Sequence, residues 1–173
     1  MTQTRESRED DLENGWQQLC DKHITKDDIV VGFSASGTTP FVLSKLKHCR
    51  KEGIPTGCIV NNPHSPIEEW ADYAVEVITG PEFVTGSTRM KAGTSQKLIL
   101  DMISTTLQIR QGRVEGNKMV NAKLINHKLI DRACRIFMER NSEYKDYEEV
   151  RQLILKAGSV KKAEMMISRH FDM

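Results

Sequence analysis

Four hydroxyl side chains and a glycine follow a short apolar segment near the start of the chain. Residues 29–33 are apolar, and after them come Ser34, Ser36, Gly37, Thr38 and Thr39. Thr39-Pro40 is typical of a helix N-cap and first helical residue. Hydroxyls, free N–H groups at a helix start and a glycine that permits unusual backbone angles suit a bound phosphate. Helix capping alone explains the same residues about equally well, so the loop by itself leaves both interpretations open.

A second loop, residues 80–94, combines glycines, hydroxyls and two cations just before a predicted helix over about 90–111. Arg89 and Lys91 stand beside Gly-Ser-Thr at the helix start. The alternative for both cations is ordinary surface charge. Their place next to hydroxyls and a helix start favours anion binding, so this is a second candidate anion loop.

The elements that would position these loops are strands separated by helices. Segments 29–33, 54–60 and 73–78 are predicted strands, and the helices between and after them are predicted over about 40–52, 66–70 and 90–111. This order predicts an α/β protein with a parallel sheet. Ligands in such sheets bind at the carboxyl ends of the strands, where both loops and Asn61-Asn62 are expected to meet. Flanking helices are predicted over about 10–20, 122–140, 146–157 and 159–170.

Composition excludes several classes of protein. The 173 residues are 38% hydrophobic and 28% charged, as in ordinary globular domains. The balance of 25 basic and 24 acidic residues argues against nucleic acid or an anionic membrane as the main partner. Apolar segments are too short to span a membrane, and from the polar first residues we expect no signal peptide. The four Cys and five His lack metal-ligand spacing, so we expect reduced thiols in a cytoplasm and no metal or cofactor.

Three segments resemble the N-acetylmuramic acid 6-phosphate etherases. They are residues 34–40, 80–97 and 112–120, and the middle one is highly specific, being shared mainly with the related glucokinase regulatory protein. The resemblance covers about residues 6–140, and residues 158–163 are similar to the helical tail of the family. It implies a sugar isomerase (SIS) fold over residues 1–140, an α/β parallel sheet sandwiched by helices, with a small C-terminal helical segment over 141–173. It also implies a homodimer, cytoplasmic recycling of cell-wall sugar and no metal.

The resemblance implies a lyase that cleaves the D-lactyl ether of N-acetylmuramic acid 6-phosphate. Removal of the C2 proton of the open-chain sugar and departure of lactate from C3 need one ionised and one protonated carboxyl group. In the family the base is a glutamate of a Glu-x-x-Glu-Asp segment, here residues 6–10, so Glu9 matches the base. The residues alone favour a solvated helix start for Glu9. Contacts to the sugar phosphate are implied for Ser34, Ser36, Gly37, Thr38 and Thr39, and support of its charge for Arg89 and Lys91.

The sequence departs from the family pattern before the region of resemblance. Etherases carry there a long helical part and two strands, with a Gly-Thr-Ser-Gly-Arg phosphate loop and a following glutamate; none of these is in the chain. We therefore expect three strands in place of five, in a truncated or divided gene or a shortened descendant. The alternatives to an etherase are a non-catalytic sugar-phosphate-binding regulatory module and an inactive truncated etherase. An aldose–ketose isomerase ranks last.

Overall fold

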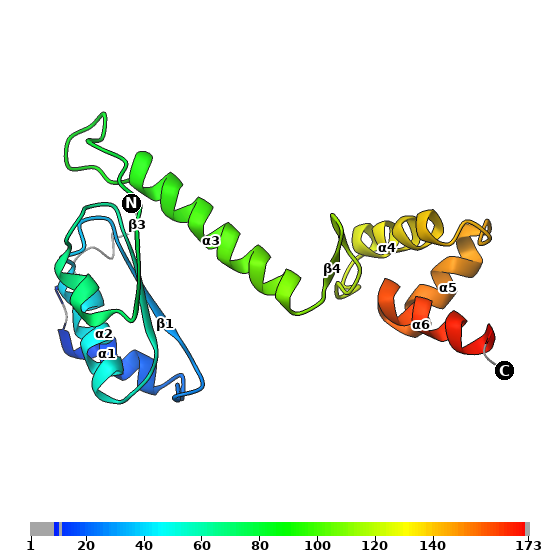
Figure 1. Cartoon of the computed structure of the whole chain (residues 1–173), viewed down its shortest axis with the longest axis horizontal. Coiled ribbons are helices and arrows are strands. Elements are labelled where there is room, and N and C mark those ends of the chain that lie inside the picture. The colour runs from blue at the N-terminus through cyan, green and yellow to red at the C-terminus, as the bar shows by residue number, and fades with distance from the viewer. Residues whose placement is uncertain (1–8, 11, 172–173) are drawn as a thin grey trace, which may run out of the picture. The chain divides into compact units, whose positions relative to one another are not determined.

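The computed structural model describes residues 9–10 and 12–171 (Figure 1). The chain divides into two compact units, residues 1–101 and 102–173, and each unit has a buried apolar cluster of its own. Helix α3 (Lys91–Arg110) contributes to both units. The predicted limits of the SIS domain and of the C-terminal segment, at residue 140, stay a prediction, because compact units describe packing and not family boundaries.

The first unit is built on a parallel sheet of three strands, in agreement with the sequence prediction. Strands β1 (Val30–Ser34), β2 (Thr56–Val60) and β3 (Tyr73–Glu76) lie in the order β1-β2-β3. Val30 pairs with Thr56 and Gly57 with Tyr73, so β2 is the central strand. All five residues of β2 are buried, which explains why its sequence carries no polar alternation.

Helix α2 (Pro40–Lys51) and the short 3-10 helix η2 (Pro66–Trp70) cover one face of this sheet. The buried cluster on that face consists of Leu46, Cys58, Val60 and Ile67. The close approach of α2 to β1 depends on Gly32, where an added Cβ would lie 2.6 Å from a methyl group of Val42. Helix α1 (Leu12–Cys20) packs against α2, with the rings of Trp16 and His48 stacked at 5.3 Å between centroids.

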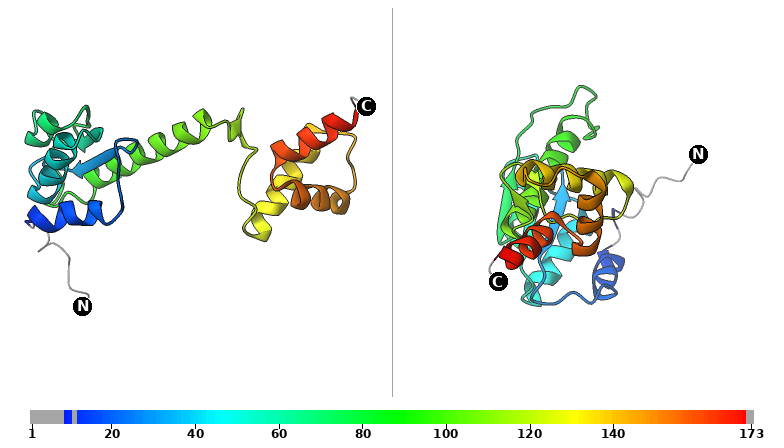
Figure 2. Two further views of the ribbon diagram at one scale, coloured as in Figure 1. Left: turned by 90° about the horizontal axis from the view of Figure 1, so that it is seen from below. Right: turned by 90° about the vertical axis from the view of Figure 1, so that its right-hand side faces the viewer.

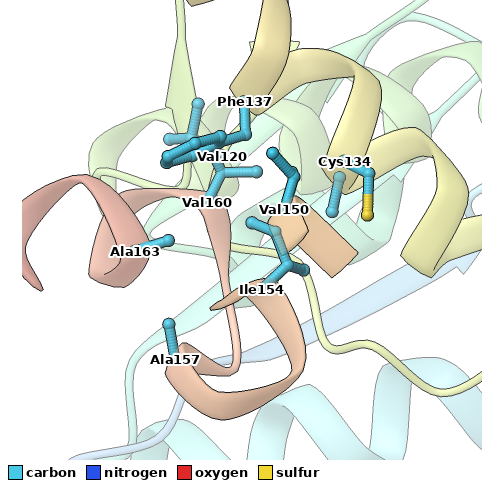
Figure 3. Close-up of a cluster of buried hydrophobic side chains, with 9 residues drawn as sticks. Val120, Cys134, Phe137, Val150, Ile154, Ala157, Val160 and Ala163 are labelled. Atoms are coloured by element: carbon cyan, nitrogen blue, oxygen red, sulfur yellow. The ribbon is translucent and has the colours of Figure 1, made fainter. Parts of the chain in front are cut away.

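The second unit contains a small hairpin and three helices. The hairpin pairs β4 (Val114–Glu115) with β5 (Lys118–Met119), and the helices are α4 (His127–Arg140), α5 (Tyr147–Ala157) and α6 (Val160–Phe171). Figure 2 shows the three helices packed together, and Figure 3 shows the shared core around Phe137. The predicted helix start at residue 122 is wrong, because Asn126 caps α4 by accepting a hydrogen bond from the N–H of Leu129 at 2.9 Å.

Ion pairs join the elements of the second unit. Arg140 of α4 donates to Glu115 of the hairpin at 2.7 Å and to Glu164 of α6 at 2.6 Å. Hydrogen bonds from Lys161 and Arg140 hold the pKa of Glu115 below its ordinary value.

Over the described residues, none of the helices has the length and apolar character needed to cross a membrane.

Candidate functional site

The loop that follows β1 gathers its hydroxyl groups into one network. The buried Ser34 hydroxyl lies 2.9 Å from that of Thr39 and accepts a hydrogen bond from the N–H of Gly37 at 2.9 Å. Ser36 and Thr38 are exposed, and their hydroxyls lie 2.9 Å apart. The loop therefore has an inner hydroxyl that fixes its shape and two outer hydroxyls that are open to solvent.

Gly37 allows the loop to turn against the segment after β2. Its φ of +71° lies in the left-handed region, and an added Cβ would lie 2.1 Å from the Cβ of Ser65. The carbonyl of Gly37 also accepts a hydrogen bond from the N–H of Ile67 at 3.2 Å. The special backbone angles expected of Gly37 are thus present, and they bring the first two interstrand loops together.

The start of α2 is where Glu9 meets the loop. Helix α2 begins at Pro40 as predicted, with Thr39 as N-cap residue, but the Thr39 side chain bonds Ser34 and not the helix backbone. The N–H of Phe41 in the first turn donates to the backbone carbonyl of Glu9 at 2.9 Å. Glu9 is exposed and is thereby held beside the helix start. Residues 6–8 of the same segment lie outside the described residues.

The second loop supplies its own anion to the start of α3. The Glu82 carboxylate accepts hydrogen bonds from the N–H groups of Lys91 and Ala92, each at 3.0 Å. These bonds, that from Ala92 foremost, lower the pKa of Glu82. In return, the Lys91 ammonium donates to the carbonyl of Pro81 at 2.9 Å. The helix start expected to receive a ligand anion is occupied by Glu82, while Arg89 lies exposed on the same loop.

Asn61, at the carboxyl end of β2, links the first loop, the segment after β3 and the beginning of α3. It is 6% exposed, and its N–H donates to the carbonyl of Ala35 at 3.1 Å. Its side-chain amide donates to the carbonyl of Val77 and to the hydroxyl of Ser95, both at 2.8 Å. Its side-chain oxygen accepts from Gln96 at 2.9 Å. The sequence placed Asn61 at this edge, but it did not show that Asn61, Ser95 and Gln96 fasten α3 to the sheet.

The arrangement combines an open hydroxyl loop, a carboxylate beside it and a second polar loop at one edge of the sheet. Ser34, Ser36, Gly37, Thr38 and Thr39 are brought together, whereas Lys91 is tied to the loop of residues 80–82. Within the part of the chain that the structure describes, no group of three His, Cys, Asp or Glu side chains is placed to hold a metal ion. The N–H groups of Gly37, Thr38 and Phe41, which were expected to be free for a ligand, donate within the chain. Such a site can bind a phosphate through its exposed hydroxyl groups and can remove a proton with a carboxylate.

Comparisons with known proteins agree with this architecture. The sequence profile of the SIS domain matches residues 16–105. Three similar proteins are each named N-acetylmuramic acid 6-phosphate etherase. That of Bacteroides thetaiotaomicron is 53% identical over 165 residues, which cover 95% of this chain and 59% of the relative. That of Porphyromonas gingivalis (strain ATCC 33277) is 53% identical, with coverage of 90% and 56%, and that of Bacteroides fragilis (strain ATCC 25285) is 49% identical, with coverage of 91% and 56%.

The chain spans somewhat more than half of the length of these relatives and matches their C-terminal part. The SIS domain profile covers the strands β1 to β3 and most of α3, which are the elements that position both polar loops. The chain therefore belongs to the SIS domain family, and within it the chain is related to the N-acetylmuramic acid 6-phosphate etherases.

Proposed function

We propose that the protein acts as a carbon–oxygen lyase on N-acetylmuramic acid 6-phosphate, releasing D-lactate and N-acetylglucosamine 6-phosphate. The names of the relatives support this reaction. The structural observation that carries the proposal is the hydrogen bond between the Phe41 N–H and the Glu9 carbonyl. That bond keeps a candidate base within one helical turn of a candidate phosphate loop.

The 6-phosphate binds to the Ser34–Thr39 loop in this proposal. The exposed hydroxyls of Ser36 and Thr38, now paired with each other at 2.9 Å, exchange that contact for phosphate oxygens. Ser34 and Thr39 hold the loop from within, and Gly37 lets its backbone turn. Arg89 adds positive charge from the second loop, and Lys91 acts there chiefly by holding the loop to α3.

Glu9 acts as the general base. Its carboxylate takes the proton from C2 of the open-chain sugar, which leaves an enolate, and the C3–O bond to lactate then breaks with a proton supplied by a general acid. Water adds at C3 of the unsaturated aldehyde and C2 takes back a proton. The sum is sugar plus water giving two products, so the scheme needs no oxidant or reductant.

A second candidate function is sugar-phosphate binding without catalysis, as in a regulatory module or an inactive etherase. One observation favours it. Among the described residues, the side chains hydrogen-bonded to the Ser34–Thr39 loop carry hydroxyl and amide groups, and no carboxylate that would serve as the acid is among them. Binding is common to both candidates, and proton exchange at C2 separates them.

We further propose a cytoplasmic homodimer. The four cysteines are free thiols, as expected in a reducing compartment. Helix α3 exposes apolar side chains along its length, a pattern that calls for a partner surface; they are Leu98, Leu100, Met102, Ile103, Leu107 and Ile109. Such a helix supports self-association through α3.

The phosphate assignment is tested by calorimetry with N-acetylmuramic acid 6-phosphate and its unphosphorylated form. Ser36→Ala removes one outer hydroxyl and is expected to weaken binding of the phosphorylated sugar by about 1–3 kcal/mol, the range for hydrogen bonds to charged groups. Ser142→Ala, at an exposed serine of the second unit, is the matched control and is expected to leave the affinity unchanged. Equal affinities for the phosphorylated and free sugars would contradict the assignment.

A further inference from the structure

A cleft lies at the amino ends of β2 and β3, whereas the hydroxyl loop lies at the carboxyl end of β1. Its volume is about 380 Å³, which is within the range of about 300–1,000 Å³ that is usual for small-ligand sites. The last turn of α2 and the segments that lead into β2 and β3 form its walls. We call it the amino-edge cleft, and it is lined by Arg50, Gly53, Ile54, Pro55, Asp72 and Tyr73.

Asp72 carries the negative charge of the amino-edge cleft, and hydrogen bonds hold its carboxylate in place. The N–H of Thr56 donates to Asp72 Oδ2 at 2.8 Å, and the Thr56 hydroxyl lies 2.9 Å from the same oxygen. These bonds, that from the N–H foremost, lower the pKa of Asp72, so its carboxylate is ionised at neutral pH. Asp72 is exposed, and no donor among the described residues bonds its other oxygen, Oδ1.

Arg50 carries the positive charge of the same cleft. Its Nη1 donates to the backbone carbonyl of Glu69 at 2.6 Å, which uses one of the five N–H donors of the guanidinium. Arg50 is close enough to lower the pKa of Asp72 a little further, but among the described residues the two form no ion pair. Two opposite charges therefore line one cleft, and each is held by its own neighbour.

The rest of the cleft surface is apolar side chain or bare backbone. Tyr73 is 67% exposed, and Pro55 is half-buried. At Gly53 an added Cβ would have only the Lys26 side chain within 4 Å, with the nearest atom at 3.5 Å. A small molecule can therefore approach the backbone here while its apolar part lies against Tyr73 and Pro55.

We propose that the amino-edge cleft binds a free α-amino acid with an apolar side chain. The carboxylate of the amino acid accepts hydrogen bonds from the Arg50 guanidinium, and its ammonium donates to Asp72 Oδ1. Its side chain lies against Tyr73 and Pro55. An amino acid fits because it carries both charges on one small molecule, whereas a simple anion would leave Asp72 unmatched and a simple amine would leave Arg50 unmatched. The inference is independent of the proposed lyase reaction, which uses the other end of the strands.

The test is a nuclear magnetic resonance titration of the full 173-residue chain with L-leucine. We expect saturable shifts of the amide signals of Gly53, Ile54 and Tyr73. Two further probes divide the ligand, because 3-methylbutylamine is leucine without its carboxylate and 4-methylpentanoate is leucine without its ammonium. Each is expected to bind at least about tenfold more weakly than leucine, since each loses hydrogen bonds between charged groups.

Variants of the two charged residues test the same assignment from the side of the protein. Arg50→Gln and Asp72→Asn are each expected to weaken leucine binding at least about tenfold. Asparagine keeps an oxygen for the bonds from Thr56, so the local fold is preserved. Arg132→Gln and Glu143→Gln are the controls, because both residues are exposed on the second unit, and they are expected to leave the affinity unchanged.

Three outcomes would overturn the proposal. The first is that leucine causes no saturable shift in the unaltered chain. The second is that 4-methylpentanoate or 3-methylbutylamine binds as tightly as leucine, which would make the cleft a site for a single charge. The third is that a control variant weakens binding as much as Arg50→Gln or Asp72→Asn does. Circular dichroism of each variant, matching that of the unaltered chain, shows that lost binding reflects the cleft and not unfolding.

Discussion

Gly37 is the residue on which the shape of the candidate phosphate loop depends most directly. It is buried at the turn between β1 and α2, with a φ of +71° and Ser65 against the position of its missing side chain. Gly53, at the end of α2, has the same φ of +71° but the nearest side-chain atom, of Lys26, would lie 3.5 Å from an added Cβ. Both positions therefore strain the backbone of any other residue, but only at Gly37 would an added side chain also overlap a neighbour.

Replacing each glycine by alanine is therefore expected to have unequal effects. In Gly53→Ala the only cost is that of an alanine in the left-handed conformation, so the free energy of unfolding is expected to fall by about 1–2 kcal/mol. In Gly37→Ala the alanine adopts the same conformation and must also displace Ser65, so the free energy of unfolding is expected to fall by an amount on the order of 3 kcal/mol or more. Urea unfolding followed by tryptophan fluorescence measures both. Equal losses would show that the Ser65 contact does not constrain the loop.

Glu82 gives the second loop a dependence on pH. Hydrogen bonds from Ala92 and Lys91 lower its pKa in the folded chain, so the ionised form stabilises the loop above the ordinary glutamate pKa of about 4.3. The stabilisation is lost as the pH falls from there through the lowered folded pKa. We expect the protection of the Lys91 and Ala92 amides from hydrogen exchange to fall in that window.

Glu82→Gln is the matched variant, because it has the same shape and no charge to titrate. Its amide protection at Lys91 and Ala92 should be lower than that of the unaltered chain at neutral pH and should change little on acidification. Nuclear magnetic resonance at a series of pH values between about 6 and 3 makes the comparison. A parallel decline in both proteins would assign the acid effect to other carboxylates.

At the scale of elements, Asn61 holds the beginning of α3 to the central strand. Its side chain makes three hydrogen bonds, to Val77, Ser95 and Gln96. Its neighbour Asn62 is exposed and makes one side-chain bond, to the carbonyl of Ala35 at 2.8 Å. Two adjacent asparagines therefore differ in burial and in the number of partners.

Asn61→Ala is expected to lower the free energy of unfolding by about 2–3 kcal/mol, because buried polar partners are left unpaired. Asn62→Ala is expected to cost about 1 kcal/mol or less. Chemical denaturation of the two variants side by side measures the difference. The account of how α3 is fastened would be contradicted if Asn62→Ala were the more damaging change.

Local sequence patterns were sufficient to predict the main elements. The apolar segments gave the three strands, Thr39-Pro40 gave the start of α2, and the glycine after α5 gave its end at Gly158, whose φ is +82°. The β4–β5 hairpin was not predicted as a pair of strands, since two residues per strand leave no alternation to detect. The late start of α4 depends on a single cap at Asn126.

The candidate site was predictable in its residue types but not in its connections. The hydroxyls of the first loop converge as expected, because they follow one another at the end of a strand. That Glu82 would occupy the α3 start, and that Asn61 would join β2 to Ser95, depends on contacts between segments far apart in the sequence. Periodicity and propensity carry no information on such contacts.

At the scale of the whole molecule, two buried clusters predict two unfolding events. The core around Phe137 lies wholly in the second unit, and the cluster around Leu46 lies wholly in the first. Both tryptophans of the chain, Trp16 and Trp70, belong to the first unit. Tryptophan fluorescence therefore reports on the first unit, while helical circular dichroism reports on both.

Phe137→Ala empties a site that is fully buried and is expected to destabilise the second unit by about 3–5 kcal/mol. The circular dichroism transition should then split or begin at lower urea, while the midpoint by tryptophan fluorescence stays where it was. Leu46→Ala is expected to lower the midpoint by tryptophan fluorescence and the part of the circular dichroism transition that comes from the first unit, and to leave the part from the second unit unchanged. A lowered fluorescence midpoint in Phe137→Ala would show that the two units unfold as one.

The central claim is that Glu9 is the base that removes the C2 proton, and deuterium exchange at C2 tests it most directly. N-acetylmuramic acid 6-phosphate is incubated in heavy water with the chain, alone and mixed with the part of the B. thetaiotaomicron relative that precedes the matched region. Label at C2 and D-lactate are both measured. We expect exchange with the unaltered chain, its loss in Glu9→Gln, and its retention in Glu52→Gln, the same change at the far end of α2. Exchange at the original rate in Glu9→Gln would contradict the claim. If none of the proteins catalyses exchange although each still binds the sugar phosphate, the protein is a sugar-phosphate-binding module and not a lyase.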